Sequence, residues 1–161
     1  MQELIKKIEQ WAIDRELDKK GTVEGQSIKT AEEIAELIKG ISKDNIDLIK
    51  DRIGDVFVTL VIGNMLKNNY NLIEKNKRVK DPAYIGDKKG LIQLLASNVI
   101  NIIESPYESR TITATLKNLN IISNYYSLDL KDCVESAYNE IANRKGKTIN
   151  GTFVKDEDLS E

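Results

Sequence analysis

The chain has 161 residues, 40% of them apolar and 31% charged, which is enough to bury one core, so we expect a single globular domain over residues 1–161. Its 24 Lys and Arg nearly balance its 26 Asp and Glu, and this excludes the basic field with which proteins bind nucleic acid polymers. Histidine is absent, which excludes Ser-His-Asp triads and most zinc sites, and the single cysteine, Cys133, cannot form an internal disulfide. Any chemistry must therefore use carboxylates, lysines, amides and a hard metal ion.

Apolar residues recur with a helical period along almost the whole chain, and the two prolines stand at breaks between the periodic segments. This pattern predicts helices at about 2–18, 24–40, 44–68, 88–104, 110–126 and 129–145. The charged, turn-rich stretch 74–90 is expected to form a surface loop, and the residues after Arg144 an irregular tail. The predicted fold class is therefore an all-α helical bundle of about six helices.

The first predicted helix is amphipathic and carries the only tryptophan of the chain. Trp11 shares an apolar face with Ile5 and Ile8, where tryptophan most often packs in a core, and the alternative is that it stacks on a nucleobase. The segment "ELIKKIEQWAI" follows Met1 almost directly and does not resemble a signal sequence, and no later segment is apolar for long enough to span a membrane. We therefore expect a cytoplasmic protein without a membrane partner.

A polar stripe runs along the edge of the apolar face of the second predicted helix. At about 100° per residue, this stripe contains Gln26, Lys29, Glu33 and Glu36. The simplest interpretation is a solvated rim, in which Lys29 pairs with Glu33 as its i, i+4 neighbour. The alternative is that the two glutamates hold a cation, that Lys29 meets a phosphate and that Gln26 hydrogen-bonds the edge of a nucleobase.

The next predicted helix carries aspartates where a core-facing helix would carry leucine or valine. Asp51 and Asp55 lie one turn apart, and Asp55 interrupts an almost wholly apolar run. An unpaired buried carboxylate is costly, so a cation must meet Asp55. One interpretation is a salt bridge to a lysine or to Arg52 of a neighbouring subunit. The other is that antiparallel packing brings both aspartates against Glu33 and Glu36, with a divalent ion such as Mg²⁺ holding the four groups together.

These residues carry a resemblance to a known family. The segments "EEIAEL" and "IGDVFVTL" resemble the E-x-x-E … E-x-x-D signature of the MazG-like, all-α nucleoside triphosphate pyrophosphatase superfamily. The segments "EQWAIDREL", "GQSIKTAEE" and "AYNEIANRKGKTINGTFVK" are similar to the short MazG-like proteins of phages and low-GC bacteria. The resemblance covers most of residues 1–68 and 129–155, and the region of about 71–127 is expected to be an inserted helical pair.

The resemblance implies hydrolysis of a nucleoside triphosphate between its α and β phosphates, with Mg²⁺ or Mn²⁺ as cofactor and a monophosphate and pyrophosphate as products. It makes Glu33, Glu36 and Asp55 the catalytic and metal-binding carboxylates. The remaining glutamate of the signature falls at Arg52, which cannot bind a metal, and Asp51 is the obvious substitute. Nothing in the sequence selects a base or a sugar, or identifies the carboxylate that acts as general base.

We expect the phosphates to be met near the end of the last predicted helix. Four cations follow this helix or end it, namely Arg144, Lys145, Lys147 and Lys155. Cations at this place are also expected from the helix macrodipole alone. The resemblance puts Asn139 near the phosphates as well. We further expect residues 146–155 to be mobile without ligand and to order when nucleotide binds.

The helix predicted over 44–68 is apolar around more of its circumference than a small bundle needs. We therefore expect it to be buried in a homodimer or homotetramer, which the resemblance also implies. Two rival function classes remain beside the enzyme. One is a non-catalytic helical nucleotide or metal binder, which the arginine at position 52 favours. The other is an interaction protein of a phage, whose acidic stripes form salt bridges at its surface.

Overall fold

The computed structural model describes residues 1–69, 73 and 86–156. Over these residues the chain forms seven helices and one β-hairpin. In chain order they are α1 (Gln2–Asp14), α2 (Leu17–Lys20), α3 (Val23–Ser42), α4 (Ile46–Leu66), α6 (Lys88–Glu104), α7 (Ser109–Tyr125), α8 (Leu130–Ala142), β1 (Gly146–Ile149) and β2 (Thr152–Lys155). The all-α prediction is confirmed. The first predicted helix is divided into α1 and α2, because Glu16 has a left-handed backbone with φ of 59°.

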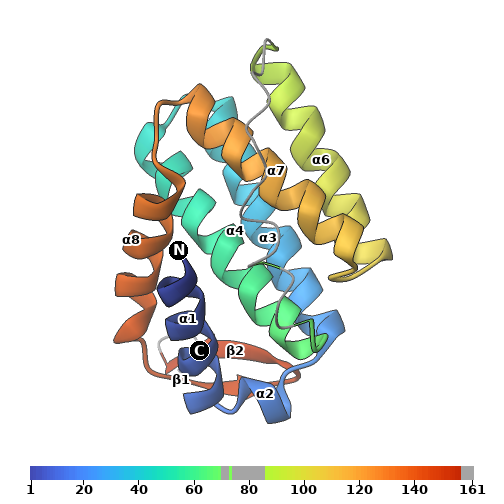
Figure 1. Cartoon of the computed structure of the whole chain (residues 1–161), viewed down its shortest axis with the longest axis vertical. Helices are drawn as coiled ribbons and strands as arrows, with labels where there is room; N and C mark the ends of the chain where they lie inside the picture. The colour runs from blue at the N-terminus through green and yellow to red at the C-terminus, as the bar shows by residue number, and fades with distance from the viewer. Residues whose placement is uncertain (70–72, 74–85, 157–161) are drawn as a thin grey trace.

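Helix α4 is the centre of the molecule. It runs antiparallel to α3, with α1 and α8 on one side of the pair and α6 and α7 on the other (Figure 1). Every residue from Val56 to Met65 is buried, because α1, α3, α7 and α8 all contact α4. The apolar circumference of α4 is therefore covered within one chain, and the argument that it requires an oligomer is wrong. The homodimer or homotetramer itself stays a prediction.

Helices α6 and α7 form the helical pair that the sequence predicts within about 71–127. The loop between them inserts Tyr107, which is fully buried and has φ of 53°. Its hydroxyl lies 2.7 Å from Oγ1 of Thr30 in a hydrogen bond. Its ring covers Gly63 so closely that a Cβ added there would lie 1.9 Å from a ring carbon. This one side chain fixes the α6–α7 pair to both α3 and α4.

The C-terminal tail that the sequence predicts follows α8, and over residues 146–155 it is ordered as a β-hairpin. β1 and β2 pair antiparallel, with Gly146 opposite Lys155. Asn150 and Gly151 form the two-residue turn, and their φ angles of 49° and 87° are the left-handed values that such a turn requires. The strands are only four residues each, which is why their alternation does not stand out in the sequence.

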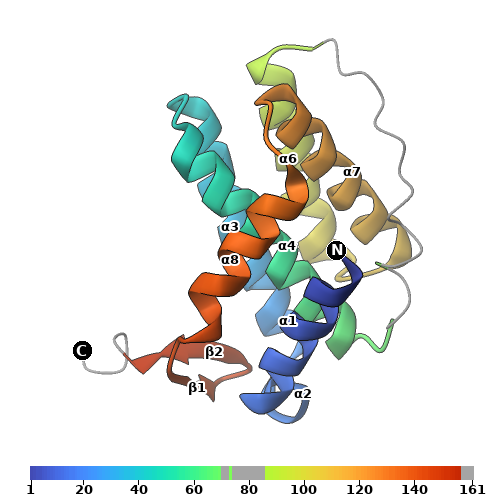
Figure 2. The ribbon, with the colours of Figure 1, turned by 60° about the vertical axis from the view of Figure 1, so that its left-hand side comes forward.

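The hairpin lies beside the lower end of α1 and at the C-terminal end of α8 (Figure 2). The ring of Phe153 meets that of Trp11 edge to face, with 5.2 Å between the centroids. Trp11 is 7% exposed, and its Nε1 donates a hydrogen bond of 2.8 Å to the carbonyl oxygen of Ile141, so its interpretation as a core residue is confirmed. The amide of Thr22 donates to the carbonyl oxygen of Gly151 at 3.0 Å. These contacts dock the hairpin against α1 and the start of α3.

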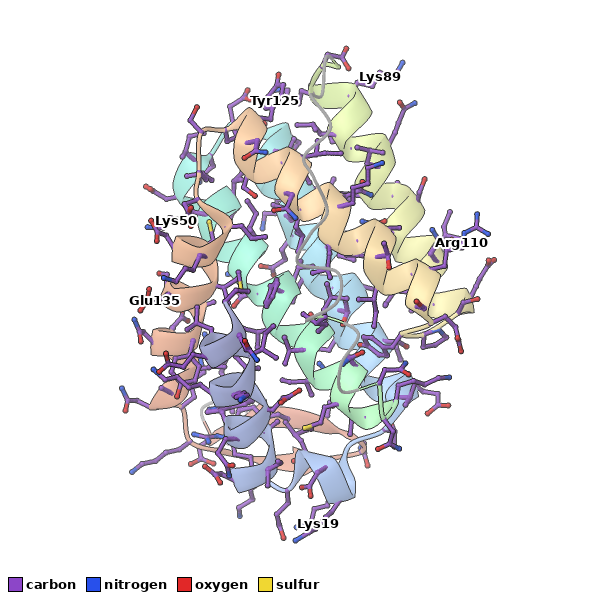
Figure 3. The ribbon with its side chains drawn as sticks, in the orientation of Figure 1. Lys19, Lys50, Lys89, Arg110, Tyr125 and Glu135 are labelled. Carbon is purple, nitrogen blue, oxygen red and sulfur yellow. The ribbon has the colours of Figure 1, made fainter. Side chains whose placement is uncertain are left out.

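The loop predicted over 74–90 lies largely outside the described residues, and where the description resumes Lys88 already begins α6. Side chains such as Lys19, Lys89, Arg110 and Glu135 point outward at the edge of the molecule (Figure 3). Among the described helices, none combines the length and the apolar character that crossing a membrane requires.

The contact between Tyr107 and Gly63 leads to a prediction about stability. We expect Gly63→Ala to lower the free energy of unfolding by about 1–3 kcal/mol, because the added methyl group overlaps the Tyr107 ring. Gly40→Ala is the control, since it makes the same change within α3, where the atom nearest to an added Cβ is Cγ1 of Ile49 at 3.2 Å. Its effect should be clearly smaller. Urea unfolding followed by circular dichroism measures both, and equal effects of the two changes would contradict the locking role of Tyr107.

Candidate functional site

Three of the predicted carboxylates meet on one cation. Nη1 of Arg52 lies 3.1 Å from Oε2 of Glu33 and 2.7 Å from Oδ2 of Asp55. Nε of Arg52 lies 3.0 Å from Oε2 of Glu36, as an ion pair without the geometry of a hydrogen bond. The structure therefore brings Glu33, Glu36 and Asp55 together around Arg52. This arginine comes from the same chain, not from a neighbouring subunit.

A glycine of α4 allows a third helix to approach this cluster. A Cβ added to Gly54 would lie 2.4 Å from the carbonyl oxygen of Cys133, so α8 packs directly on the α4 backbone. This approach brings Glu140 of α8, and Arg144 just after its end, close enough to Asp55 to influence the charge of its carboxyl group. Glu140 and Arg144 form an ion pair with each other. The site is therefore built from α3, α4 and α8.

Burial controls the protonation of the cluster. The side chains of Glu33 and Asp55 are 9% and 13% exposed, whereas that of Glu36 is 50% exposed. Burial in the first place, and the Glu33 carboxylate in the second, raise the pKa of Asp55 to about 6 against the opposing effect of Arg52. Burial alone would lower the pKa of Arg52, but its three carboxylate neighbours raise it. Arg52 thus keeps its charge, while Asp55 exchanges a proton near neutral pH.

Glu33 connects the cluster to a second cation. Its Oε1 lies 2.9 Å from Nζ of Lys29, which also lies 3.1 Å from Oε2 of Glu32. The i, i+4 pairing of Lys29 with Glu33 is confirmed. Burial would lower the pKa of Lys29, but the two glutamates raise it. Because Oε2 of Glu33 contacts Arg52, both of its carboxylate oxygens face a cation.

The donor types of the cluster suit a hard divalent ion, because Mg²⁺ prefers carboxylate oxygens. Over the residues that the structure describes, however, no group of three acidic or cysteine side chains is arranged to hold a metal as it stands. Instead, the guanidinium of Arg52 lies where the three carboxylates converge. An ion can take that place only when Arg52 moves away. The side chain of Arg52 is 27% exposed and therefore has access to solvent.

Two further predicted residues lie elsewhere than expected. Asp51 is exposed. It was expected to join the other predicted carboxylates, but these contact Arg52. In this arrangement Asp51 therefore does not take the place of the missing motif glutamate. Gln26 is 3% exposed, and its Nε2 donates a hydrogen bond of 3.2 Å to the carbonyl oxygen of Thr59. This bond ties α3 to α4 and commits the Gln26 side chain to the core.

The residues predicted to meet phosphates are only partly assembled. Arg144 lies near Asp55, and its carbonyl oxygen accepts a hydrogen bond of 2.6 Å from Nη2 of Arg15. Lys145 is exposed and borders, with Arg144, a pocket of 380 Å³ at the end of α8. Asn139 is exposed on α8, and the helical period turns it away from the face that packs on α4. Of this predicted group, Arg144 is the member that reaches the cluster.

The sequence interpretation considered Arg52 as a partner of Asp55 only from a neighbouring subunit, and it did not include Glu140. Arg52 precedes Asp55 by three residues, and Glu140 precedes Arg144 by four. Both spacings are those of ion pairs within one helix. The three-residue spacing could have identified Arg52 as a partner of Asp55 within the same helix.

Comparison with known proteins finds a relative among phage proteins. The chain is 34% identical over 160 residues to an uncharacterized 18.2 kDa protein in the rep-hol intergenic region of Haemophilus phage HP1. The match covers 85% of this chain and 97% of the phage protein. No family model and no solved structure matches the chain. The comparison therefore supplies a relative but no activity.

The raised pKa of Asp55 predicts a pH-dependent effect of Asp55→Asn in EDTA. A folded-state pKa of about 6, above the unfolded value of about 3.9, means that stability is lost as the pH rises between these two values. Above this window the buried charge remains a cost, which the neutral amide avoids. We therefore expect a higher melting temperature for Asp55→Asn than for the wild type at pH 8, and a difference that vanishes below about pH 4.

Asp51→Asn is the control for this experiment, because it removes an exposed carboxylate from the same helix and should change little at any pH. Differential scanning calorimetry over the pH series gives both differences. A lower melting temperature of Asp55→Asn at pH 8 would mean that the Arg52 ion pair outweighs burial.

Proposed function

This chain belongs to the same family as the Haemophilus phage HP1 protein, and we propose that it is a Mg²⁺-dependent nucleoside triphosphate pyrophosphohydrolase. The proposed reaction splits a (d)NTP with water into a monophosphate and pyrophosphate, as part of nucleotide-pool housekeeping in the cytoplasm. The observation that carries the proposal is the convergence of Glu33, Glu36 and Asp55, from two helices, on one cation position. The same residues match the MazG-like signature, so motif and geometry support one assignment.

Within this proposal the chain's own residues have distinct roles. Glu33, Glu36 and Asp55 would hold the divalent ion, which supplies charge neutralisation and a more acidic bound water. The Asp55 carboxyl, with its pKa of about 6, is suited to accept a proton near neutral pH. Lys29 on the Glu33 side and Arg144 on the Asp55 side offer positive charge to phosphate oxygens.

The direct test is pyrophosphate release from a panel of standard and modified (d)NTPs. We expect release with Mg²⁺ or Mn²⁺ and none with EDTA. Glu36→Gln should lower kcat by about a hundredfold or more, because it removes one anionic ligand from a half-exposed position without disturbing the core. Glu104→Gln is the control, because it makes the same change at an exposed glutamate at the end of α6, and it should keep wild-type activity. Activity retained in Glu36→Gln would contradict the site.

A second prediction tests the cation position without turnover. Arg52→Met leaves two buried carboxylates without their shared cation, so in EDTA it should lower the free energy of unfolding by about 3–5 kcal/mol. Millimolar Mg²⁺ should then restore much of the lost stability, because a divalent ion can replace the guanidinium. The wild type should gain far less from Mg²⁺, since Arg52 already fills the position.

The double change Arg52→Met with Asp55→Asn is the control, because it removes one of the ligands and should lose most of the Mg²⁺ effect. Thermal unfolding at fixed ionic strength measures all three proteins. An equal Mg²⁺ response of Arg52→Met and the wild type would identify the cluster as an ion-pair network and not a metal site.

The contacts of Arg52 also favour a second candidate function, a non-catalytic helical protein that binds nucleotide. In this alternative Arg52 stays on the carboxylates permanently and stabilises the interface of α3 with α4. Nucleotide binding without pyrophosphate release, together with no Mg²⁺ response of Arg52→Met, would support it over the enzyme.

A further inference from the structure

A groove separates the start of α3 from the C-terminal hairpin. It has a volume of 300 Å³, at the lower end of the range of small-molecule sites. Gly25, Ile28 and Lys29 line it from α3, and Asn150 and Phe153 line it from the hairpin. Two parts of the chain that are far apart in sequence therefore form its walls.

The lining of the groove is mixed, with Glu32 and Thr152 beside the apolar side chains, and its two largest apolar side chains are Ile28 and Phe153. Ile28 is 56% exposed, which is unusual for an isoleucine that has a core beside it. Phe153 is fixed by its edge-to-face contact with Trp11. The hairpin approaches Gly25 so closely that a Cβ added there would lie 3.1 Å from the carbonyl oxygen of Gly151. The groove thus presents an aliphatic and an aromatic wall at a fixed separation, without a side chain from Gly25 between them.

Lys29 joins the groove to the carboxylate cluster. It lines the groove, and its Nζ lies 2.9 Å from Oε1 of Glu33, whose other oxygen contacts Arg52. A ligand that extends from the groove toward the cluster therefore meets Ile28 and Phe153 first and then Lys29, whose Nζ lies 3.1 Å from the Glu32 carboxylate at the same wall. The chemistry that matches this order is a flat ring with polar edges, joined to an anionic chain.

We propose that this groove binds the nucleobase of the nucleotide whose phosphates lie at the cluster, an inference that rests on the proposed function. The base lies between Ile28 and Phe153, and the Asn150 amide is available to its polar edge. The phosphates leave the groove past Lys29. The sequence suggested Trp11 and Gln26 as base contacts, but both side chains are buried. In this proposal Trp11 supports the Phe153 ring from behind and does not contact the base itself.

The test compares Ile28→Ser with Ile100→Ser. Ile100 is 57% exposed on α6, away from the groove, so the two changes remove equal side chains from equally exposed helical positions. The probes are the α,β-imido analogues of the four dNTPs, which are not hydrolysed, and inorganic tripolyphosphate, which has no base. Calorimetric titration gives affinities, and the emission of Trp11, the single tryptophan, reports binding next to Phe153.

We expect Ile28→Ser to weaken binding of the best dNTP analogue about tenfold, equivalent to roughly 1.4 kcal/mol, and to leave tripolyphosphate binding unchanged. Ile100→Ser should change neither. Equal affinities of Ile28→Ser and Ile100→Ser for the analogue, or equal losses for analogue and tripolyphosphate, would overturn the base site. Absence of any nucleotide binding would overturn it as well.

This design separates the base site from the enzymatic proposal. Base-dependent binding that Ile28→Ser weakens, in a protein that releases no pyrophosphate, supports the groove and contradicts the enzyme. Pyrophosphate release with an unchanged KM in Ile28→Ser supports the enzyme and contradicts the groove.

Discussion

The guanidinium of Arg52 makes the contact between α3 and α4 possible. Glu33 and Asp55 are almost fully buried in that contact, and a buried carboxylate without a cation costs several kcal/mol. One side chain compensates both of them and also reaches Glu36 at the surface. Any process that draws Arg52 away must therefore supply another cation, so the chemistry of this site and the stability of the central helix pair are coupled.

Two glycines explain how α4 is surrounded on all sides. Gly54 admits the backbone of α8, and Gly63 admits the ring of Tyr107. They are nine residues apart, which at about 100° per residue puts them on opposite faces of α4. The close approach at Gly54 is also what carries Glu140 and Arg144 to the cluster. The packing of the core and the composition of the site are thus set by the same helix.

The helical period was enough to predict the helices and to identify Asp55 as a buried carboxylate that needs a partner. It was not enough to decide whether the side chain of Asp51 or that of Arg52 meets the other carboxylates. Neighbouring positions on a helix differ by only about 100°, and the packing of α8 fixes how α4 is rotated. The apolar surface of α4 was assigned to an oligomer because the sequence does not say which helices cover it. The hairpin was missed although Asn150 and Gly151 are a strong turn signal, since its short strands depend on packing against Trp11.

The charges around the cluster explain why a triphosphate and a divalent ion would have to arrive together. With every carboxylate ionised, Glu33, Glu36 and Asp55 outnumber the cations Arg52 and Lys29 by one, so the site repels a free triphosphate. Replacing Arg52 on the carboxylates by a divalent ion would bring this balance from minus one to zero, and the released guanidinium would add one positive charge and a donor suited to phosphate oxygens. Under the proposed function, the arginine that departs from the motif would be compatible with phosphate chemistry, because its release by a metal ion would make the site less repulsive to anions.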